Sequence, residues 1–215
     1  MGRLINGING AIVGKVGTVI GSSRNGKPYI KGPYKKRTRK VSKKELANRH
    51  KFAAAQAWLK PLLNFVREGF HMYKMTSGAF MAAKSYLLRH AFEGEQQAMR
   101  INPVLVKLSV GELPLPGDIA VAQTAPGELQ FTWDTAGVQW NNKYDQVMML
   151  AYNVENAKAH FNKAYYKLTG QFRSAGADIL RIDPAPGKTW HLYLAFTSAD
   201  RSSQSDSVYL GTISN

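Results

Sequence analysis

The spacing of hydrophobic positions changes along the chain and predicts three segments. In residues 1–40, β-branched side chains stand among glycines and favour an extended chain. In residues 41–100, apolar side chains recur every three or four positions, as on one face of a helix. In residues 101–215, short apolar alternations are separated by turn residues, which is typical of strands. We therefore predict an α+β chain with these three segments as its domains.

The first segment combines a glycine repeat, Gly7 to Gly17, with a hairpin signal. Asn25-Gly26 lies between the extended stretches Thr18–Gly21 and Lys27–Lys31, and this dipeptide is typical of a type I′ turn. We predict a glycine-rich β-hairpin followed by a basic linker. Two strands bury little core, so we expect the hairpin to pack against another chain or another part of this one.

The same stretch matches the spacing of a phosphate-binding P-loop, in Gly21-Ser-Ser-Arg-Asn-Gly-Lys27. A P-loop continues with Ser or Thr and opens a helix. Here Pro28 follows, and then Tyr29-Ile30, which favour a strand. The hairpin interpretation is therefore preferred to a nucleotide site.

The second segment predicts a helical hairpin. Ser42-Lys-Lys-Glu45 has the pattern of a capping box, and Pro61 is expected to kink the first helix or split it. Thr76-Ser-Gly78 indicates a turn, after which a second helix is expected from Ala79 to about Met99. The apolar stripe of the first helix comprises Phe52, Leu59, Leu62, Val66, Phe70 and Tyr73.

Aromatic residues are abundant in this helical segment, at Phe52, Trp58, Phe65 and Phe70. A hydrophobic core is the ordinary explanation for them. An interface between subunits is the alternative, because interfaces are also enriched in aromatic side chains.

The third segment predicts an antiparallel sandwich of the fibronectin type III or immunoglobulin kind, with Trp133 in its core. The absence of a cysteine pair favours the fibronectin-like variant. A further weak strand is expected between Ala157 and Lys167. The other expected strands are Ile119–Ala122, Leu129–Trp133, Gln146–Tyr152, Ile179–Ile182, His191–Phe196 and Val208–Ile213.

Charge is concentrated at the N-terminus. The chain has 29 Lys and Arg against 14 Asp and Glu, a formal net charge of +15. Residues 1–60 hold 15 of these cations and a single acid, Glu45, whereas residues 61–215 are nearly balanced. This asymmetry predicts a basic arm on an electrically ordinary body.

The arm interleaves cations with Tyr29 and Tyr34. One interpretation is sequence-independent contact with the phosphates of DNA or RNA, and another is a solvated linker. Binding to an anionic membrane surface is a third, but the amphipathic helix that usually accompanies it is missing. The predicted nucleic-acid-binding residues are Lys27, Lys31, Lys35, Lys36, Arg37, Arg39 and Lys40.

Composition and motifs argue against several kinds of catalytic and metal-binding site. The chain has no cysteine, which excludes disulfides and thiolate ligands, and no run approaches 18 apolar residues. Its five histidines form no metal-ligand pair, and no Gly-x-Ser-x-Gly motif occurs. We expect no enzyme, no cofactor, no metal site, no signal peptide and no membrane span. The expected location is the cytoplasm, or a virion-like or other assembly.

Several short sequence segments, in their order along the chain, resemble those of an uncharacterised family of bacterial proteins. That family is defined only as a domain of unknown function. The resemblance covers nearly the whole chain and implies that the three segments form one recurring unit. It implies no catalytic residue and no ligand. The segments are Gly21-Ser-Ser-Arg-Asn-Gly-Lys-Pro-Tyr-Ile30, Ala53-Ala-Ala-Gln-Ala-Trp-Leu-Lys-Pro61, Ala82-Ala-Lys-Ser-Tyr86, Leu113-Pro-Leu-Pro116, Phe131-Thr-Trp-Asp134 and Ala199-Asp-Arg-Ser-Ser-Gln-Ser205.

Two functions follow as hypotheses. The first is a non-enzymatic structural protein that self-assembles into a particle, filament or nucleoprotein. Its hairpin would extend a neighbour's sheet, and its basic arm would contact nucleic acid or a neighbouring subunit. The second is a monomeric binding module whose sandwich loops recognise a protein or a glycan.

Overall fold

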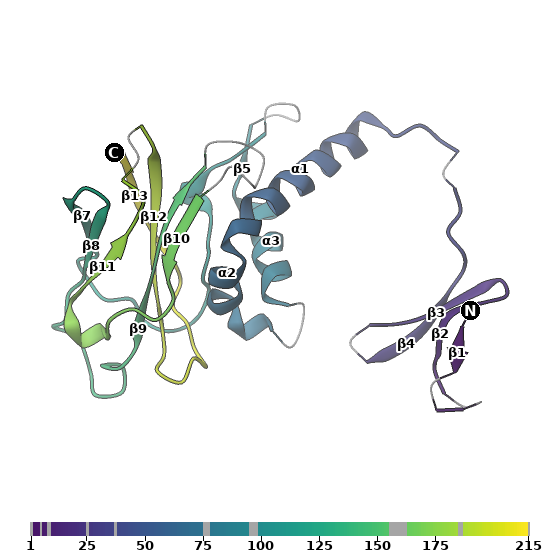
Figure 1. Cartoon of the computed structure of the whole chain (residues 1–215), viewed down its shortest axis with the longest axis horizontal. Helices are drawn as coiled ribbons and strands as arrows, with labels where there is room; N and C mark the ends of the chain where they lie inside the picture. Colours follow the sequence, from purple (N-terminus) through teal and green to yellow (C-terminus); the bar gives the residue numbers. More distant parts are fainter. Residues whose placement is uncertain are drawn as a thin grey trace. The chain divides into compact units, whose positions relative to one another are not determined.

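The structure is a computed structural model. It describes residues 2–4, 6–7, 10–24, 26–36, 38–74, 78–94, 99–154, 163–184 and 187–214. Contacts group the chain into two compact units, Met1–Val41 and Ser42–Asn215 (Figure 1). The helices and the C-terminal strands both belong to the second unit. The domain boundary expected between the helical segment 41–100 and the strand segment 101–215 stays a prediction.

The first unit is a four-stranded antiparallel sheet in the order β1-β2-β3-β4. The predicted hairpin is confirmed as β3 and β4, which pair from Ile20↔Lys31 to Arg24↔Lys27; Asn25 lies outside the described residues. The sheet is larger than predicted because Gly17, at φ +54°, allows a second tight turn between Val16 and Val19. The strands are Arg3–Leu4, Ile12–Val16, Val19–Arg24 and Lys27–Lys31.

Gly21 explains why the glycine repeat extends into β3. A Cβ atom at this position would lie 2.0 Å from the carbonyl oxygen of Ile12. Only glycine permits so close an approach of β2 to β3. The stretch that matched P-loop spacing is thus strand and turn, and no helix begins in its described residues.

The helices of the second unit follow the predicted pattern at their start. The amide of Glu45 donates to Ser42 Oγ at 3.2 Å, which confirms the N-cap. Pro61 lies in a 3₁₀ turn that separates α1 from α2. The elements are α1 (Lys43–Leu59), η1 (Lys60–Leu62), α2 (Leu63–Gly69), η2 (His71–Tyr73) and α3 (Ala79–His90).

The prediction that the second helix reaches Met99 is wrong, because α3 ends at His90. The chain then turns into a short strand, β5 (Phe92–Glu93), which pairs with β6 (Arg100–Ile101). Gly94 has φ +93°, and Asn102 N donates to the carbonyl of Ala91 at 2.8 Å. Both features favour a hairpin over continued helix. Residues 76–77 of the predicted interhelical turn lie outside the described residues.

The C-terminal strands form two antiparallel sheets, of order β10-β9-β12-β13 and β11-β8-β7. All six strands that alternation predicted are present, and β10 is the weak seventh, so the mixed α+β class is confirmed. The 3₁₀ turns η3 and η4 span Pro103–Leu105 and Arg173–Ala175. The strands are β7 (Ala120–Ala125), β8 (Glu128–Thr132), β9 (Gln146–Asn153), β10 (Lys163–Lys167), β11 (Ala177–Arg181), β12 (Thr189–Thr197) and β13 (Val208–Ser214).

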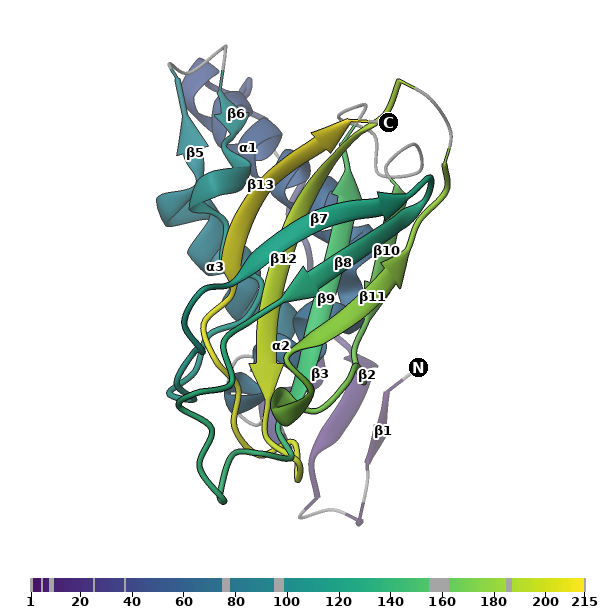
Figure 2. The same cartoon turned by 90° about the vertical axis from the view of Figure 1, so that its left-hand side faces the viewer.

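The second unit has three layers, with the four-stranded sheet between the helices and the three-stranded sheet (Figures 1 and 2). Strand β9 is buried on both faces and is therefore almost wholly apolar. Met148, Leu150 and Tyr152 pack toward the helices, whereas Val147 and Met149 pack with the strands of the other sheet.

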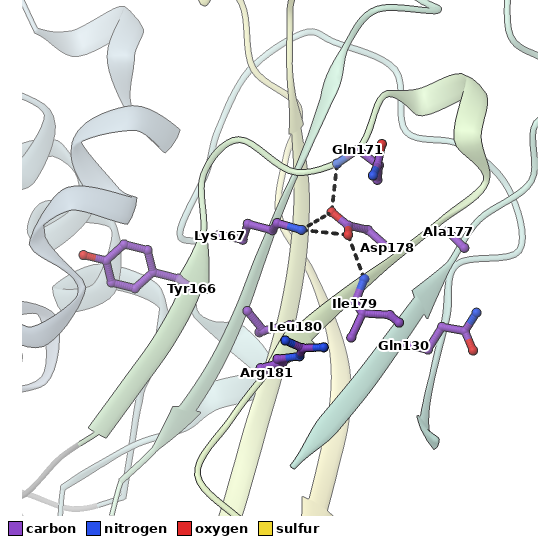
Figure 3. A pocket seen from close by; sticks show the side chains of 9 residues that line it. All are labelled: Gln130, Tyr166, Lys167, Gln171, Ala177, Asp178, Ile179, Leu180 and Arg181. Carbon is purple, nitrogen blue, oxygen red and sulfur yellow. Dashed lines mark hydrogen bonds and ion pairs between the residues drawn. The ribbon is translucent and has the colours of Figure 1, made fainter. Parts of the chain in front are cut away.

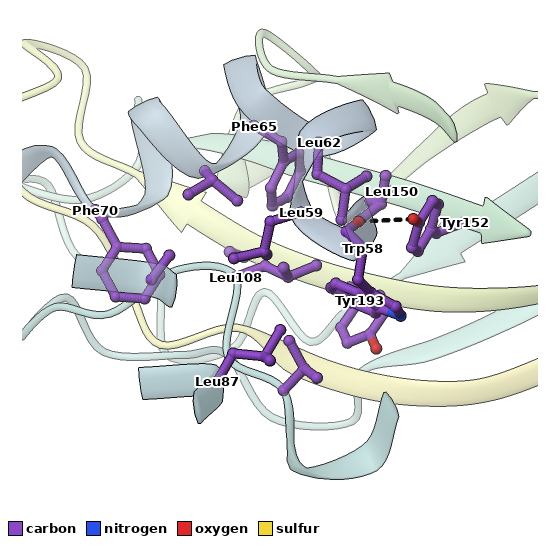
Figure 4. Packing of buried hydrophobic residues seen from close by; sticks show 14 of the residues in the cluster. Trp58, Leu59, Leu62, Phe65, Phe70, Leu87, Leu108, Leu150, Tyr152 and Tyr193 are labelled. Atoms are coloured by element: carbon purple, nitrogen blue, oxygen red, sulfur yellow. Dashed lines mark hydrogen bonds between the residues drawn. The ribbon is translucent and has the colours of Figure 1, made fainter. Parts of the chain in front are cut away.

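Aromatic side chains hold the helices on the sheet (Figure 4). The hydroxyl of Tyr152 donates to the carbonyl of Trp58 at 2.7 Å, and their rings meet edge to face. Trp58, Phe65 and Phe70 are buried, which confirms the core interpretation for them, whereas Phe52 is 47% exposed. Trp133 is buried between the two sheets as predicted. No helix among the described residues has the length and apolar character needed to cross a bilayer.

Candidate nucleic-acid interface

The predicted basic residues divide between a strand and a linker. Lys27 and Lys31 lie on β4, and both are exposed. Residues 32–41 follow, and their described part contains neither helix nor strand. Arg37 lies outside the described residues. The four described cations of the linker, Lys35, Lys36, Arg39 and Lys40, are all exposed.

Strand register brings cations together on one face of the first unit. Lys15 pairs with Ile20 and Ile20 with Lys31, so Lys15 and Lys31 stand in one row across three strands. Arg24 pairs with Lys27, two rows away along the same face. Directly opposed residues project to the same side of a sheet, as do residues two apart on a strand. We call Lys15, Arg24, Lys27 and Lys31 the cationic face.

Tyrosine side chains accompany these cations. Tyr29 pairs with Ser22 in the row between the other two rows of the cationic face, and it is 44% exposed. Tyr34, in the linker, is 88% exposed. Exposed aromatic rings beside Lys and Arg can stack on nucleic-acid bases while the cations contact phosphates.

The opposite face of the same sheet is apolar. Val16 pairs with Val19 there, and Ile30 shares this side with Pro28. Ile30 is 61% exposed and Val16 is 45% exposed. The sheet is therefore amphipathic, with one cationic and one apolar face.

No carboxylate within the first unit neutralises its charge. Residues 1–41 contain ten Lys and Arg and no Asp or Glu. The first acid along the chain is Glu45, on α1, and its carboxylate accepts from Arg49 at 2.7 Å. Ten cations so close together repel one another, and a polyanion would relieve that repulsion.

Sequence reasoning missed Lys15 and Arg24 as members of this face. Arg24 could have been found, because a two-residue turn at Asn25-Gly26 places it opposite Lys27. Lys15 could not, since its place depends on the pairing of β2 with β3, for which no hairpin had been expected.

The free edge of β4 is poorly suited to strand addition. The Arg24↔Lys27 pair flanks a two-residue turn, so these two residues form a hydrogen-bonded pair. Because hydrogen-bonded and non-hydrogen-bonded pairs alternate, the backbone groups of Pro28 and Ile30 point away from β3, toward the free edge. Pro28 has no N–H, so Ile30 supplies the outward donor of this strand. Lysine and proline on an edge strand oppose pairing with another chain.

The second unit has a groove of about 620 Å³ between the edge strands β10 and β11 (Figure 3). At its centre Lys167 Nζ donates to both carboxylate oxygens of Asp178, at 2.8 and 3.1 Å. The amides of Gln171 and Ile179 also donate to Asp178. Because its carboxylate is satisfied by these neighbours, Asp178 is a structural tie between the two sheets.

The described part of the chain shows no candidate metal site. No group of three or more His, Asp or Glu with metal-binding geometry occurs among those residues. His191, on β12, makes a 3.0 Å hydrogen bond with the hydroxyl of Tyr209, and burial lowers its pKa. These contacts assign it a structural role in the sheet.

The comparison with known proteins identifies the family. No curated protein matches the chain. A family model described as a family of unknown function, DUF6266, matches residues 11–211. The match begins directly before β2, which carries Lys15 of the cationic face, and ends within β13, so it covers most of both units. The chain belongs to the DUF6266 family of unknown function.

Proposed function

We propose that this chain is a non-enzymatic structural protein that assembles with further copies of itself and binds nucleic acid through its N-terminal unit. The observation that carries the proposal is the charge of that unit, which has ten cations and no acid. Five of these cations project from one face of the sheet, because Arg3 pairs with Val13 on the side of the cationic face. Such a surface favours phosphates of any sequence, through release of condensed counterions.

The apolar face of the first unit supports self-assembly. A sheet of about forty residues without disulfides buries too little surface to be stable alone. Covering Val16 and Ile30 with the same face of a second copy would bury them and leave both cationic faces outward. The edge of β4 is blunted by Pro28, so we propose contact through the face rather than through strand addition.

The two C-terminal sheets support a fibronectin type III-like sandwich as part of this proposal. Their orders are β7-β8-β11 and β10-β9-β12-β13, with Trp133 between them. Seven antiparallel strands in two packed sheets with a buried tryptophan are typical of this class. In the proposed protein it is the building block, with the helices covering one outer face.

A monomeric binding module is the second candidate. Exposed aromatic side chains at one end of the sheets favour it, notably Trp140, which is 80% exposed. Loops at the end of a sandwich are a common place for recognition of a protein or a glycan.

Nucleic-acid binding is tested by removing the cationic face. We expect the full-length protein to bind labelled DNA or RNA non-specifically, with affinity falling steeply between 50 and 200 mM salt. Replacing the four cations with Gln should lower the slope of log affinity against log salt by about three to four, at ~0.9 per phosphate contact. Fluorescence anisotropy measures both quantities. The variant carries Lys15→Gln, Arg24→Gln, Lys27→Gln and Lys31→Gln.

A matched control removes four exposed cations of the second unit, which changes the net charge equally. It should keep the slope within about one unit of the wild type. Equal losses in both variants would show that binding follows net charge alone, and binding that survives in both would refute the role of the face. The control carries Lys44→Gln, Lys60→Gln, Arg67→Gln and Arg100→Gln.

Self-assembly is tested separately, without nucleic acid. Light scattering of the full-length protein should show a mass that rises with concentration, and Ile30→Ser should shift this rise to higher concentration. A monomer at every concentration would contradict the proposal and favour the binding module.

A further inference from the structure

A cavity of about 320 Å³ lies in the helical layer of the second unit. Its walls come from η2, from α3 and from the segment 107–110. Met81 at its side is 50% exposed, so the cavity is open to solvent. We call this cavity the helical pocket, and its lining includes Phe70, Tyr73, Tyr86, Arg89, His90 and Lys107.

Two exposed rings of the pocket rest on inner rings. Tyr73 is 39% exposed, and its ring lies against that of Phe70, with 6.0 Å between the ring centres. His90 is exposed, and its ring centre lies 4.6 Å from that of Tyr86, one helical turn before it. A ring supported in this way loses little freedom when a ligand stacks on it. The pocket therefore offers flat surfaces that are ready for stacking.

The pocket also carries positive charge. Its basic side chains are Arg89, His90 and Lys107, and the described lining contains no Asp or Glu. Asp206 accepts a hydrogen bond from Lys107 Nζ, so that cation is already paired. Arg89 is exposed in the last turn of α3 and forms no ion pair with another described residue. Its guanidinium can therefore contact an anion bound in the pocket.

A ligand that suits both features has a flat aromatic ring with a negative charge close to it. A nucleotide has both, since its base can stack on a Tyr or His ring while its phosphate contacts a cation. Acidic side chains of a peptide would supply the charge but no ring. The volume is sufficient for a base, because cavities from about 300 Å³ upward hold ligands of drug size.

We propose that the helical pocket binds one base of a single-stranded nucleic acid, which stacks on Tyr73 or His90 while Arg89 contacts a phosphate. This inference rests on the nucleic-acid binding proposed above and adds a contact in the second unit. The cationic face contacts phosphates, which single strands and duplexes both have. A base in a duplex is paired and stacked, so it enters a pocket only when it is extruded. The pocket therefore favours single strands.

The preference for single strands is measured with two labelled probes, a short single-stranded DNA and the duplex of the same sequence. The pocket variant carries Tyr73→Ser and Arg89→Gln. It should bind the single strand about 10-fold more weakly, which is the size expected for the loss of one stacked base. Duplex binding should stay within about threefold, because only one cation is lost. Fluorescence anisotropy of the full-length proteins gives both affinities.

A matched control makes the same two kinds of substitution elsewhere in the second unit. It carries Tyr144→Ser, at a ring that is 50% exposed, and Arg181→Gln, at a side chain that is 83% exposed. Both of its affinities should stay within about threefold of the wild type. An equal loss for both probes in the pocket variant, or the same loss in the control, would overturn the role of the pocket.

Photocrosslinking locates the bound base directly. A single strand that carries a photoreactive iodouracil should crosslink to Tyr73 or His90, because such a base reacts with the ring on which it stacks. Crosslinks confined to residues 1–41 would overturn the pocket and leave the proposed function intact. A full-length protein that binds neither probe would overturn both.

Labelled poly-glutamate tests the alternative of an acidic peptide as the ligand. Its affinity for the pocket variant should stay within about threefold of its affinity for the wild type, because only one cation is lost. A loss as large as that for the single strand would show that the pocket recognises charge alone. That result would overturn the stacking of a base.

Discussion

The two units of this chain use their hydrophobic residues in opposite ways. In the second unit large side chains such as Phe65, Trp190 and Tyr193 are fully buried between three layers. In the first unit, the apolar side chains of Leu4, Val16 and Ile30 remain about half exposed or more. The two units also differ in charge, because the 41 residues of the first unit carry +10 of the net charge of +15.

This difference shows that the two units gain stability from different sources. The second unit has a large internal core, which buries aromatic side chains such as Phe65 and Trp190. In the proposed function, contact with nucleic acid offsets the repulsion within the first unit, and contact with another copy covers its apolar face. The function proposed for the chain therefore assigns binding to the first unit, whose cations have no acid within the unit and whose apolar face is exposed.

The largest expected effect is in the core of the second unit. Phe65→Ala should lower the free energy of unfolding by about 3–5 kcal/mol, because it leaves a cavity between the helices and the sheet. Tyr34→Ala, at an 88% exposed ring of the linker, should change it by less than about 0.5 kcal/mol. Urea denaturation measures both values, and similar losses would remove the contrast between the units.

A smaller and local effect is expected at Gly21. Gly21→Ala places a methyl group against the backbone of Ile12, which should disrupt the first sheet at a cost of about 1–3 kcal/mol. Hydrogen exchange should then lose protection in residues 12–31, while the thermal midpoint of the second unit stays within about 1 °C. If the second unit melts early too, the units are not independent.

The smallest expected effect is a difference between the two units in how they respond to pH. All five histidines belong to the second unit, and residues 1–41 contain no His, Asp or Glu, so the side-chain charge of the first unit is nearly constant between pH 5 and 8. Burial lowers the pKa of His191 below 6.5, so the unfolded chain takes up its proton first. Stability should therefore fall as the pH drops below about 6.5.

His191→Gln should flatten this decline, and it keeps a polar partner for Tyr209. The free energy of unfolding at pH 7.5 and 5.5 gives the comparison. Nucleic-acid binding at the same two pH values should change little, because Lys and Arg stay charged. Equal pH slopes in wild type and variant would contradict the assignment to His191.

Much of the second unit could be predicted because its signals are local. Alternation located the strands from β7 to β13, and the capping box located the start of α1. The end of α3 was missed because residues 91–94 look helical in sequence, whereas the β5–β6 pairing that replaces helix is made with residues several positions later. Phe52 was wrongly grouped with the core because a stripe does not show how far a helix is covered.

The candidate site shows the same division. Charge clustering identified the basic linker and β4 from composition alone. The register of β2, β3 and β4 then placed Lys15 and Arg24 beside Lys27 and Lys31. Spacing along the chain could not show this face, because it is formed by strands that pair across turns.

The sequence by itself determined the element types, the burial of Trp133 and the concentration of positive charge at the N-terminus, since period and composition are local properties. Only the tertiary structure decided which residues share a surface. It placed Lys15, Arg24, Lys27 and Lys31 on one face of a small sheet and Val16 and Ile30 on the other, and it set Tyr144 against Phe172 beside a buried ion pair. Contacts of this kind join residues far apart in the chain, and they are fixed by strand pairing and core packing rather than by any local pattern.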